Sequence, residues 1–397
     1  MKGEAVRHAM NGVAEAPGKT WFWELAAAVV DADRCVRCGA CVAVCPSDSI
    51  GLNDQGLPAL VKMCTGCSLC WDACPRAGLR VEALGPAGGP APAAPDELGE
   101  PVALVAARAA RRAPRAQDGG VVTAVLAAGL DSGALDGALV AVPSADGQPL
   151  RAEAKVVTSA AELGRAAGST YHQVMALAAL DLAGVDLPKG SRLAVVGTPC
   201  VVQGLQAMQR RPWPGGTGRH RVADVVLSIA LLCTKSFDYQ ALVLEELAAR
   251  RGVDLERVGK VDVTEGRLVV TYLDGQVAVD EPVKAFHGAA LRGCAECPDV
   301  LGHSADLAVG SVGSLPGWST VLVRSEAGRA ALDRARPRLD LKEADDPEAL
   351  RRLARADRRA AERALPRPLE PQGRLWIEWD EHRTWFSGSD RAPVAAP

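Results

Sequence analysis

Eight cysteines near the N-terminus form two runs of the same spacing. The runs are CVRCGACVAVCP at residues 35–46 and CTGCSLCWDACP at residues 64–75. Each follows C-x2-C-x2-C-x3-C-P, a spacing with which thiolates hold [4Fe–4S] clusters, and the fourth cysteine of each run binds the cluster of the other run. The spacing therefore predicts one cluster on Cys35, Cys38, Cys41 and Cys74, and a second on Cys64, Cys67, Cys70 and Cys45.

Zinc binding and disulfide bonds are the alternatives for these cysteines. A zinc site is complete with four ligands, so zinc gives no reason for two tandem runs that each end in Cys-Pro. Disulfides persist in oxidising compartments, whereas residues 1–20 carry scattered charges and no apolar signal-peptide core. The spacing favours iron–sulfur binding, and residues 31–83 are predicted to be a small bacterial-type ferredoxin domain that needs its clusters in order to fold.

Four more cysteines lie in the rest of the chain. Cys200 and Cys233 each follow an apolar stretch that reads as a strand, and Cys294 and Cys297 form a C-x2-C-P loop. Functional groups of α/β sheets gather at the carboxyl ends of strands. These four thiolates could converge on a third [4Fe–4S] cluster, and the alternative is two core cysteines beside a zinc or redox pair.

From residue 102 onwards the sequence alternates between apolar strands and amphipathic helices. Strands are predicted at 102–105, 138–142, 193–196, 225–232, 307–309 and 320–323, and helices at 121–130, 174–183 and 239–251. The predicted fold class is α+β, in which the ferredoxin domain is fused to a larger α/β flavin-binding domain. The predicted parts are a helical extension (1–30), the ferredoxin domain (31–83), a linker rich in Pro, Gly and Ala (84–101), the α/β domain (102–325) and a charged helical C-terminal region (326–397).

Two glycine-containing segments precede predicted helices. Gln117-Asp118-Gly119-Gly120 presents backbone N–H groups at a helix N-terminus, where an anionic phosphate is favoured, and Gly168-Ser169-Thr170 repeats the arrangement. Each alone is typical of an ordinary helix start. Together they fit a flavin dinucleotide, and a chain of one-electron clusters needs such a group to divide a hydride into single electrons.

Composition excludes several other classes of function. A net charge of −3 gives no reason to expect a nucleic-acid partner. No apolar stretch reaches the roughly 18 residues that a membrane helix needs. We expect a cytoplasmic protein. Any attachment to a membrane would run through a partner complex.

Six blocks of the sequence occur in an order that resembles one known family. The blocks are QDGGVVTAV (117–125), AGSTYH (167–172), VGTPC (196–200), LCTKSF (232–237), FHGAALRGCAECPD (286–299) and GWSTVLVR (317–324). This order resembles the beta subunits of coenzyme F420 hydrogenases and dehydrogenases, with the ferredoxin domain fused in front as in the input subunits of F420H2 dehydrogenases. The resemblance covers about residues 31–325.

The resemblance implies a coenzyme F420-dependent oxidoreductase. It implies an α/β domain that binds FAD and exchanges hydride with coenzyme F420 or a related carrier, a [4Fe–4S] cluster on Cys200, Cys233, Cys294 and Cys297, and a redox protein or larger complex as partner. Three clusters per chain are therefore expected. The expected FAD or substrate contacts are Gln117, Asp118, Gly119, Gly120, Thr123, Gly168, Ser169, Thr198, Lys235 and His287, with His172 as a further candidate.

Two positions depart from the family pattern. Thr170 stands where the family often has lysine, and Ser311 stands where an aspartate is usual. Either change could alter which hydride carrier fits. The alternatives are therefore a different conjugated-ring substrate, as in relatives that reduce chlorophyll derivatives, or a non-enzymatic electron relay, and the direction of electron flow stays open.

Overall fold

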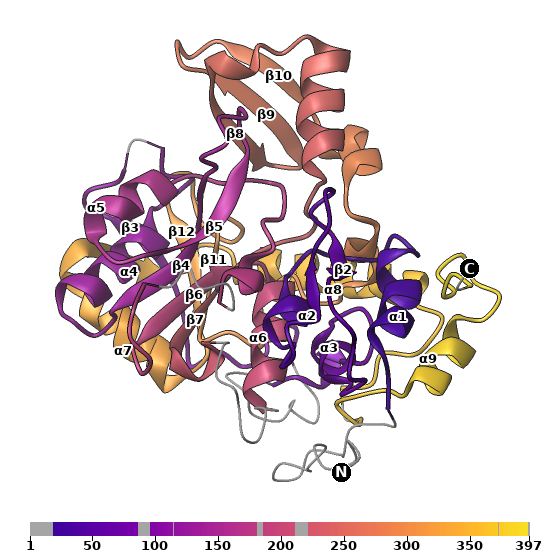
Figure 1. Ribbon diagram of the computed structural model, residues 1–397. Coiled ribbons are helices and arrows are strands. Elements are labelled where there is room, and N and C mark those ends of the chain that lie inside the picture. The colour runs from indigo at the N-terminus through magenta and orange to yellow at the C-terminus, as the bar shows by residue number, and fades with distance from the viewer. Residues whose placement is uncertain are drawn as a thin grey trace.

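The computed structural model describes residues 19–85, 96–113, 115–180, 186–210, 221–371 and 373–395. Over these residues the chain forms a small cysteine-rich unit at the N-terminus and a larger domain built on one central sheet (Figure 1). Most of the predicted 84–101 linker, residues 86–95, and most of the predicted 1–30 extension lie outside the described residues.

The central sheet of the larger domain has eight strands in the order β13-β3-β12-β11-β7-β6-β4-β5. Neighbours from β11 to β4 run parallel, and the remaining pairs are antiparallel. The strands are β3 (Ala103–Ala109), β4 (Gly137–Pro143), β5 (Ala152–Val157), β6 (Leu193–Gly197), β7 (Val225–Leu231), β11 (Leu307–Gly310), β12 (Ser319–Val323) and β13 (Leu339–Glu343).

The parallel strands are apolar throughout because both faces of the sheet are covered. In β6, Leu193 and Val195 belong to one apolar core, whereas Ala194 belongs to the core on the opposite face. Strands buried on both sides give continuous apolar runs rather than alternation. This is why the runs at 193–196 and 225–232 could be assigned from sequence.

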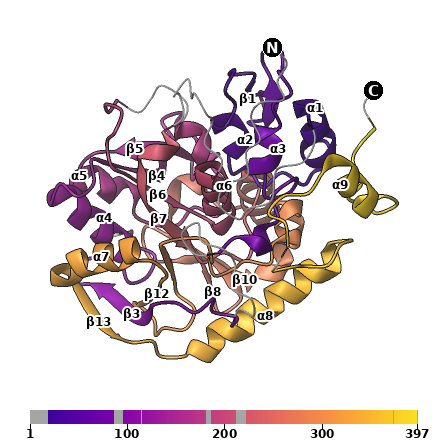
Figure 2. The ribbon, with the colours of Figure 1, turned by 90° about the horizontal axis from the view of Figure 1, so that it is seen from below.

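One face of the sheet is covered by α4 (Val121–Asp131) and α7 (Glu326–Ala335), which also pack on each other (Figure 2). Ser325 caps α7 by accepting a hydrogen bond from the N–H of Gly328 at 3.1 Å. The small helix α5 (Ala160–Leu163) packs beside α4. These elements leave the opposite face for the redox residues.

The opposite face carries α6 (Pro199–Arg210), α8 (Pro347–Ala364) and the cysteine-rich unit. The unit contains α1 (Phe22–Leu25), a π-helical turn (Ala26–Val30), α2 (Ala40–Ala43), α3 (Leu69–Ala73) and a hairpin of β1 (Ile50–Leu52) and β2 (Pro58–Leu60). Its buried side chains and those of α6 and the sheet form one continuous apolar core. The unit is therefore packed against the larger domain and does not extend from it on a tether.

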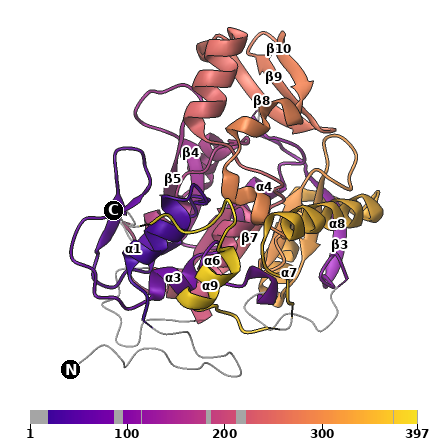
Figure 3. The same ribbon diagram turned by 90° about the vertical axis from the view of Figure 1, so that its right-hand side faces the viewer.

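The C-terminal region belongs to both parts of the protein. Strand β13 pairs with β3, so the sheet continues past the predicted boundary at residue 325. Helix α9 (Trp379–Phe386) then lies near α1 and α3 (Figure 3). The Nε1–H of Trp71 donates to Ile377 O, and the Nε1–H of Trp376 donates to Asp72 O, each at 3.0 Å. The C-terminal segment thus stabilises the cysteine-rich unit.

A second, three-stranded sheet projects from the body of the protein (Figure 1). It consists of β8 (Val258–Thr264), β9 (Arg267–Tyr272) and β10 (Val277–Pro282), and has its own apolar core against the π-helix Gln240–Arg250. The predicted helix at 174–183 is a 3-10 helix, Ala176–Leu180, and residues 181–185 lie outside the described residues. No helix among the described residues is long and apolar enough to span a membrane.

Candidate functional site

The eight cysteines of the N-terminal unit fall into two neighbourhoods. Burial, followed by the charges of Cys35 and Cys74, raises the pKa of Cys41. Burial, followed by the charges of Cys67, Cys64 and Cys45, raises the pKa of Cys70. The first group is Cys35, Cys38, Cys41 and Cys74, and the second group is Cys45, Cys64, Cys67 and Cys70. These are the crossed neighbourhoods that the predicted ligand assignment requires.

Backbone N–H groups point at the sulfurs of both groups. Arg37 N lies 3.4 Å from Cys35 Sγ, and Ser49 N lies 3.2 Å from Cys45 Sγ. Gly39 allows the close fit of the first loop, because a Cβ there would lie 2.5 Å from Ala178 N and its φ is +85°. The loops are therefore shaped to stabilise negative charge on sulfur.

The four remaining cysteines converge as a third group. Cys200 lies in the first turn of α6, Cys233 follows β7, and Cys294 and Cys297 lie in and just after the 3-10 helix Arg292–Glu296. Burial, followed by Cys294 and Cys200, raises the pKa of Cys233 well above its usual value. A cation is needed to keep such buried thiols ionised.

In the part of the chain that the structure describes, no three His, Cys, Asp or Glu side chains are close enough to hold one metal ion. Tetrahedral zinc would draw four sulfurs to about 2.3 Å from one point, whereas a [4Fe–4S] cluster spreads its thiolates around four iron atoms. The cluster on each group stays a prediction.

Polar side chains surround Cys200. Gln173 Nε2 donates to Thr198 Oγ1 at 2.8 Å and to Ser236 Oγ at 3.1 Å, and lies 3.6 Å from Cys200 Sγ. Thr198 Oγ1 is itself 3.1 Å from the same sulfur. Hydrogen bonds to cluster sulfurs help to set reduction potentials. Thr198 therefore serves the third group.

The first group lies next to the third. Burial, followed by the charge of Cys200 and then that of Cys74, raises the pKa of Cys38. The first group also borders the second. Of the second-group cysteines, Cys70 alone is among the strongest influences on the pKa of Cys41. The order in space is therefore second, first and third, with the first group in the middle.

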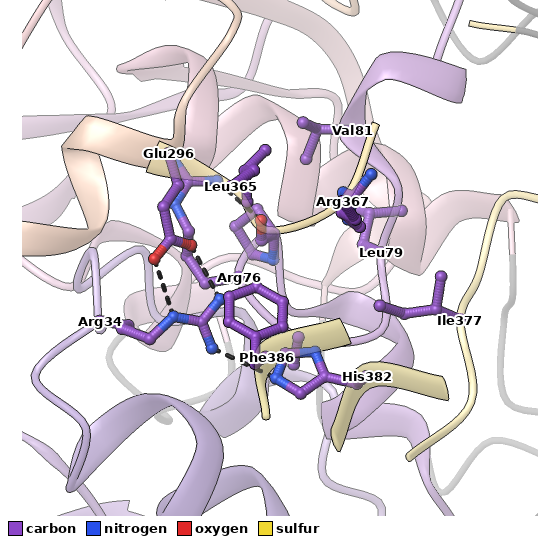
Figure 4. A pocket seen from close by; sticks show the side chains of 12 residues that line it. Arg34, Arg76, Leu79, Val81, Glu296, Leu365, Arg367, Ile377, His382 and Phe386 are labelled. Atoms are coloured by element: carbon purple, nitrogen blue, oxygen red, sulfur yellow. Dashed lines mark hydrogen bonds and ion pairs between the residues drawn. The ribbon is translucent and has the colours of Figure 1, made fainter. Parts of the chain in front are cut away.

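A buried ion pair joins the loop of the first group to that of the third (Figure 4). Arg34 donates from Nε and Nη2 to the two carboxylate oxygens of Glu296, both at 2.8 Å, and both side chains are 1% exposed. Phe386 of α9 lies 4.2 Å from the guanidinium, and His382 faces it from the same helix. Burial and the charge of Arg34 lower the pKa of His382, so its ring is neutral.

A cavity of about 850 Å³ opens beside the central sheet. It is bounded by the segment before α4, by the start of the projecting sheet and by the loop after β11. Its lining includes Arg112, Gln117, Asp118, Lys260, Asp262, Glu265, Ser311 and Trp318. Its size is that of a cofactor or ligand pocket. Three residues singled out by the sequence therefore line the same cavity. They are the predicted contacts Gln117 and Asp118, and Ser311, which departs from the family pattern.

The floor of this cavity is a polar network. Lys260 Nζ lies 3.0 Å from Asp262 Oδ2 and donates to Gln117 O at 3.1 Å. Gln117 Nε2 donates to Asp262 and, at 3.4 Å, to the hydroxyl of Tyr171. Burial, followed by Asp262, raises the pKa of Tyr171, so the phenol keeps its proton. Burial and Asp262 also raise the pKa of Asp118.

The glycines before α4 are required for packing. The N–H of Gly119 donates to Ser319 Oγ at 3.1 Å, and a Cβ at Gly119 would lie 2.5 Å from Ala107 O. Gly120 has a φ of +69° and caps α4. The Gly119 donor is thus engaged within the protein, whereas a phosphate contact at Gly120 stays a prediction.

The other predicted contacts lie in several places. Lys235 lies at the third group. Burial raises the pKa of Cys294, and the charge of Lys235 opposes that rise. Burial lowers the pKa of His287, and the charge of Lys235 lowers it further. Thr123 is half-buried in α4, Gly168 has a φ of +111°, and Ser169 lies beside Tyr171. His172 is buried, and its Nε2 accepts a hydrogen bond from Ala152 N at 3.1 Å, a structural role.

The sequence did not predict the cavity residues from the projecting sheet. Lys260 and Asp262 are charged residues in a strand whose other members are largely apolar. Such an alternation is typical of any half-exposed strand. Only the approach of β8 to Gln117 shows that these two charges face a cavity.

Three family models match stretches of this chain. Residues 28–80 match a 4Fe-4S dicluster domain, residues 104–181 match the N-terminal part of the coenzyme F420 hydrogenase/dehydrogenase beta subunit, and residues 190–347 match its C-terminal part. The chain belongs to the family of coenzyme F420 hydrogenase/dehydrogenase beta subunits. The predicted resemblance is confirmed, as is a mixed helix and sheet fold with an N-terminal [4Fe–4S] ferredoxin domain.

Relatives of this chain include coenzyme F420-linked enzymes and subunits of such enzymes. The coenzyme F420-dependent sulfite reductase of Methanocaldococcus jannaschii is 30% identical over 88% of this chain and 53% of its own length. One component of the F420H2 dehydrogenase of Methanosarcina mazei is 29% identical over 81% of this chain and 88% of its own. A chain of the F420-reducing [NiFe] hydrogenase complex from Methanosarcina barkeri superposes with a TM-score of 0.62 at 27% identity, covering 68% of this chain and 92% of that one.

Proposed function

We propose that the chain is an iron–sulfur flavoprotein subunit that exchanges hydride with coenzyme F420 and passes single electrons to a redox partner. Family membership and the activities of the named relatives support the F420-linked oxidoreductase class. The single observation that carries the proposal is a cavity of ligand size that residues 171–173 connect to three neighbouring cysteine groups.

The cavity is the proposed site of FAD and coenzyme F420. When bound, a flavin accepts a hydride and releases its electrons one at a time. Arg112 and Lys260, the latter paired with Asp262, are the basic residues of the lining that can meet anionic groups of the ligands, and the protonated Tyr171 holds Gln117 in place. Trp318 also lines the cavity, and its ring is contacted by the cations of Arg108 and Lys342.

A short segment joins the cavity to the third group. Tyr171 contacts Gln117 in the cavity wall, and Gln173, two residues further along, lies 3.6 Å from Cys200 Sγ. The backbone between these two residues spans only about 7 Å, and the side chains of Tyr171 and Gln173 cover the rest of the way to Gln117 and to Cys200. Electrons that leave a flavin in the cavity therefore have a short path to a cluster on Cys200, Cys233, Cys294 and Cys297.

The proposed exit is the second group. [4Fe–4S] clusters carry electrons singly, and the third, first and second groups follow one another in space. Cys64 and Cys67 of the second group are half-buried, and Met63 beside them is 84% exposed. The other two groups also contain half-buried cysteines, so the exit is assigned to the second group because Val61 and Met63 give it an exposed apolar surface on which a partner can dock.

An anaerobic assay tests this function. The purified protein is mixed with reduced coenzyme F420 and a viologen dye, while iron and flavin are measured on the same sample. We expect dye reduction with about twelve iron atoms and one FAD per chain. Full iron and flavin contents without dye reduction or flavin bleaching would reject coenzyme F420 as the substrate.

A different conjugated-ring substrate is the second candidate. Ser311 lines the cavity at the position where the family usually has an acid, so the wall facing the ligand is less negative than expected. Flavin bleaching by another reduced ring compound, with none by reduced coenzyme F420, would establish this candidate.

A further inference from the structure

Arg76 lies between the first and third cysteine groups. It follows Cys74-Pro75 and is 4% exposed. Its Nη1 donates to Pro75 O at 2.7 Å, and its Nε donates to Gly293 O, beside Cys294, at 2.6 Å. One guanidinium is thus fixed to a cysteine loop of the ferredoxin domain and to a cysteine loop of the larger domain.

No carboxylate among the described residues forms an ion pair with Arg76. The neighbouring Glu296 pairs with Arg34 and Arg391. The buried Arg80 of the same segment, by contrast, pairs with Glu370 and Glu381. A buried cation without a counter-charge is costly, and the negative charges that offset that of Arg76 are those of the third-group thiolates Cys297, Cys200 and Cys294 together with Glu296.

The hydrogen bonds of Arg76 place its charge beside both of these groups. Pro75, whose carbonyl accepts from Nη1, follows Cys74 of the first group, and Gly293, whose carbonyl accepts from Nε, precedes Cys294 of the third group. Neither bond reaches the 64–70 loop of the second group.

We propose that Arg76 is a positioning residue that raises the reduction potentials of the clusters on the first and third groups, and leaves that of the second group unchanged. Each reduction adds a negative charge, and a fixed cation in a low-dielectric interior stabilises the reduced form. A cation between two neighbouring clusters also lessens the repulsion between their electrons. This inference rests on the proposed three-cluster function.

The test is a redox titration of the anaerobically purified protein, followed by low-temperature electron paramagnetic resonance. In Arg76→Met, the equilibrium constant for one-electron reduction should fall at least tenfold at two clusters, a shift of about 59 mV for each. The third potential should stay at the wild-type value and acts as an internal reference. Arg76→Lys keeps the charge, and should keep both inner potentials within that shift.

Two further variants separate charge from folding. Arg80→Met removes a buried arginine of the same segment that pairs with carboxylates away from the cysteine groups, and should move no potential. Arg76→Gln removes the charge but keeps an N–H donor for Gly293 O, so it replaces the Met variant if that variant loses iron. It should lower the same two potentials.

The outcomes also separate this inference from the proposed function. Iron content of the wild-type protein near eight atoms per chain would remove the third cluster, and the first-group potential would still report on Arg76. Neutral variants with full iron and unchanged potentials would overturn the role of Arg76 alone. Equal shifts of all three potentials would do the same, because they would indicate a general loosening of the fold.

Discussion

Replacing Arg34 by methionine should weaken the attachment of the ferredoxin domain to the larger domain. The Arg34–Glu296 pair joins residues 262 positions apart in the sequence, and both side chains are 1% exposed. Methionine keeps the apolar stem of arginine and its packing beneath Phe386, but leaves the Glu296 carboxylate without its bidentate partner.

The structure gives the size of the effect. Removing one member of a buried ion pair costs about 3–5 kcal/mol, because the other charge stays buried. Glu296 retains a contact of 3.0 Å with Arg391, so the lower end of the range, about 3 kcal/mol, is expected. If the loss falls on the unfolding rate, unfolding becomes about a hundredfold faster, since 1.36 kcal/mol is a factor of ten.

The assay follows the loss of iron–sulfur absorbance in urea under anaerobic conditions. A rate is measured because cluster loss makes unfolding irreversible. Arg383→Met is the matched control, since Arg383 of α9 pairs with Asp380 at the surface, where a pair contributes about 0–1 kcal/mol. Its rate should stay within about fivefold of the wild type.

A double variant checks that the charge is responsible. Arg34→Met with Glu296→Leu removes both charges, and should unfold more slowly than Arg34→Met alone, because buried pairs can be replaced by apolar side chains at little cost. An Arg34→Met rate within about fivefold of the wild type would refute the reasoning. A double variant that unfolds faster than either single variant would show that packing, and not the ion pair, holds the domains together.

Three other substitutions give distinct results. Cys297→Ala should lower iron from about twelve to about eight atoms per chain, measured by iron analysis, and an unchanged content would exclude Cys297 as a ligand. Lys260→Met should raise KM for reduced coenzyme F420 roughly tenfold while iron content stays constant, and an unchanged KM would place the substrate elsewhere. Asp357→Asn tests a pH dependence. Burial, followed by the charge of Asp299, raises the pKa of Asp357 to about 7, above the value of the carboxyl in the unfolded chain. The wild-type protein therefore loses stability as the pH rises from about 4 to 7. The Asn variant should therefore melt above the wild type at about pH 8 and at the same temperature at about pH 4, and equal melting temperatures at the higher pH would contradict it.

The cysteine groups could be predicted from sequence because their information is local. Three ligands of each N-terminal group lie within seven residues, and the spacing alone excludes most other uses of thiols. The apolar strands could be predicted for the same reason, since each is a short continuous run. The third group combines two strand ends with one C-x2-C loop, and the sequence placed its members without showing that they meet.

The association of the two domains could not be predicted. The Pro-rich segment at 84–101 suggested a tethered ferredoxin domain, whereas the structure gives the two domains one apolar core. The contacts that decide this, such as Arg34 with Glu296, join residues far apart in sequence. Lys260 and Asp262 were missed on similar grounds, because their role depends on where the projecting sheet approaches the cavity.

One short segment, residues 171–177, contacts three of the four parts of the proposed electron path: the cavity, the third group and the first group. Tyr171 holds the cavity residue Gln117, Gln173 lies 3.6 Å from Cys200 Sγ, and Leu177 N donates to Cys38 O in the first group at 3.0 Å. A few residues of backbone therefore link these three contacts. The ferredoxin domain, by holding Leu177, also helps to fix Tyr171 beneath the cavity, so we expect that removing this domain would disturb the substrate site as well as the exit for electrons.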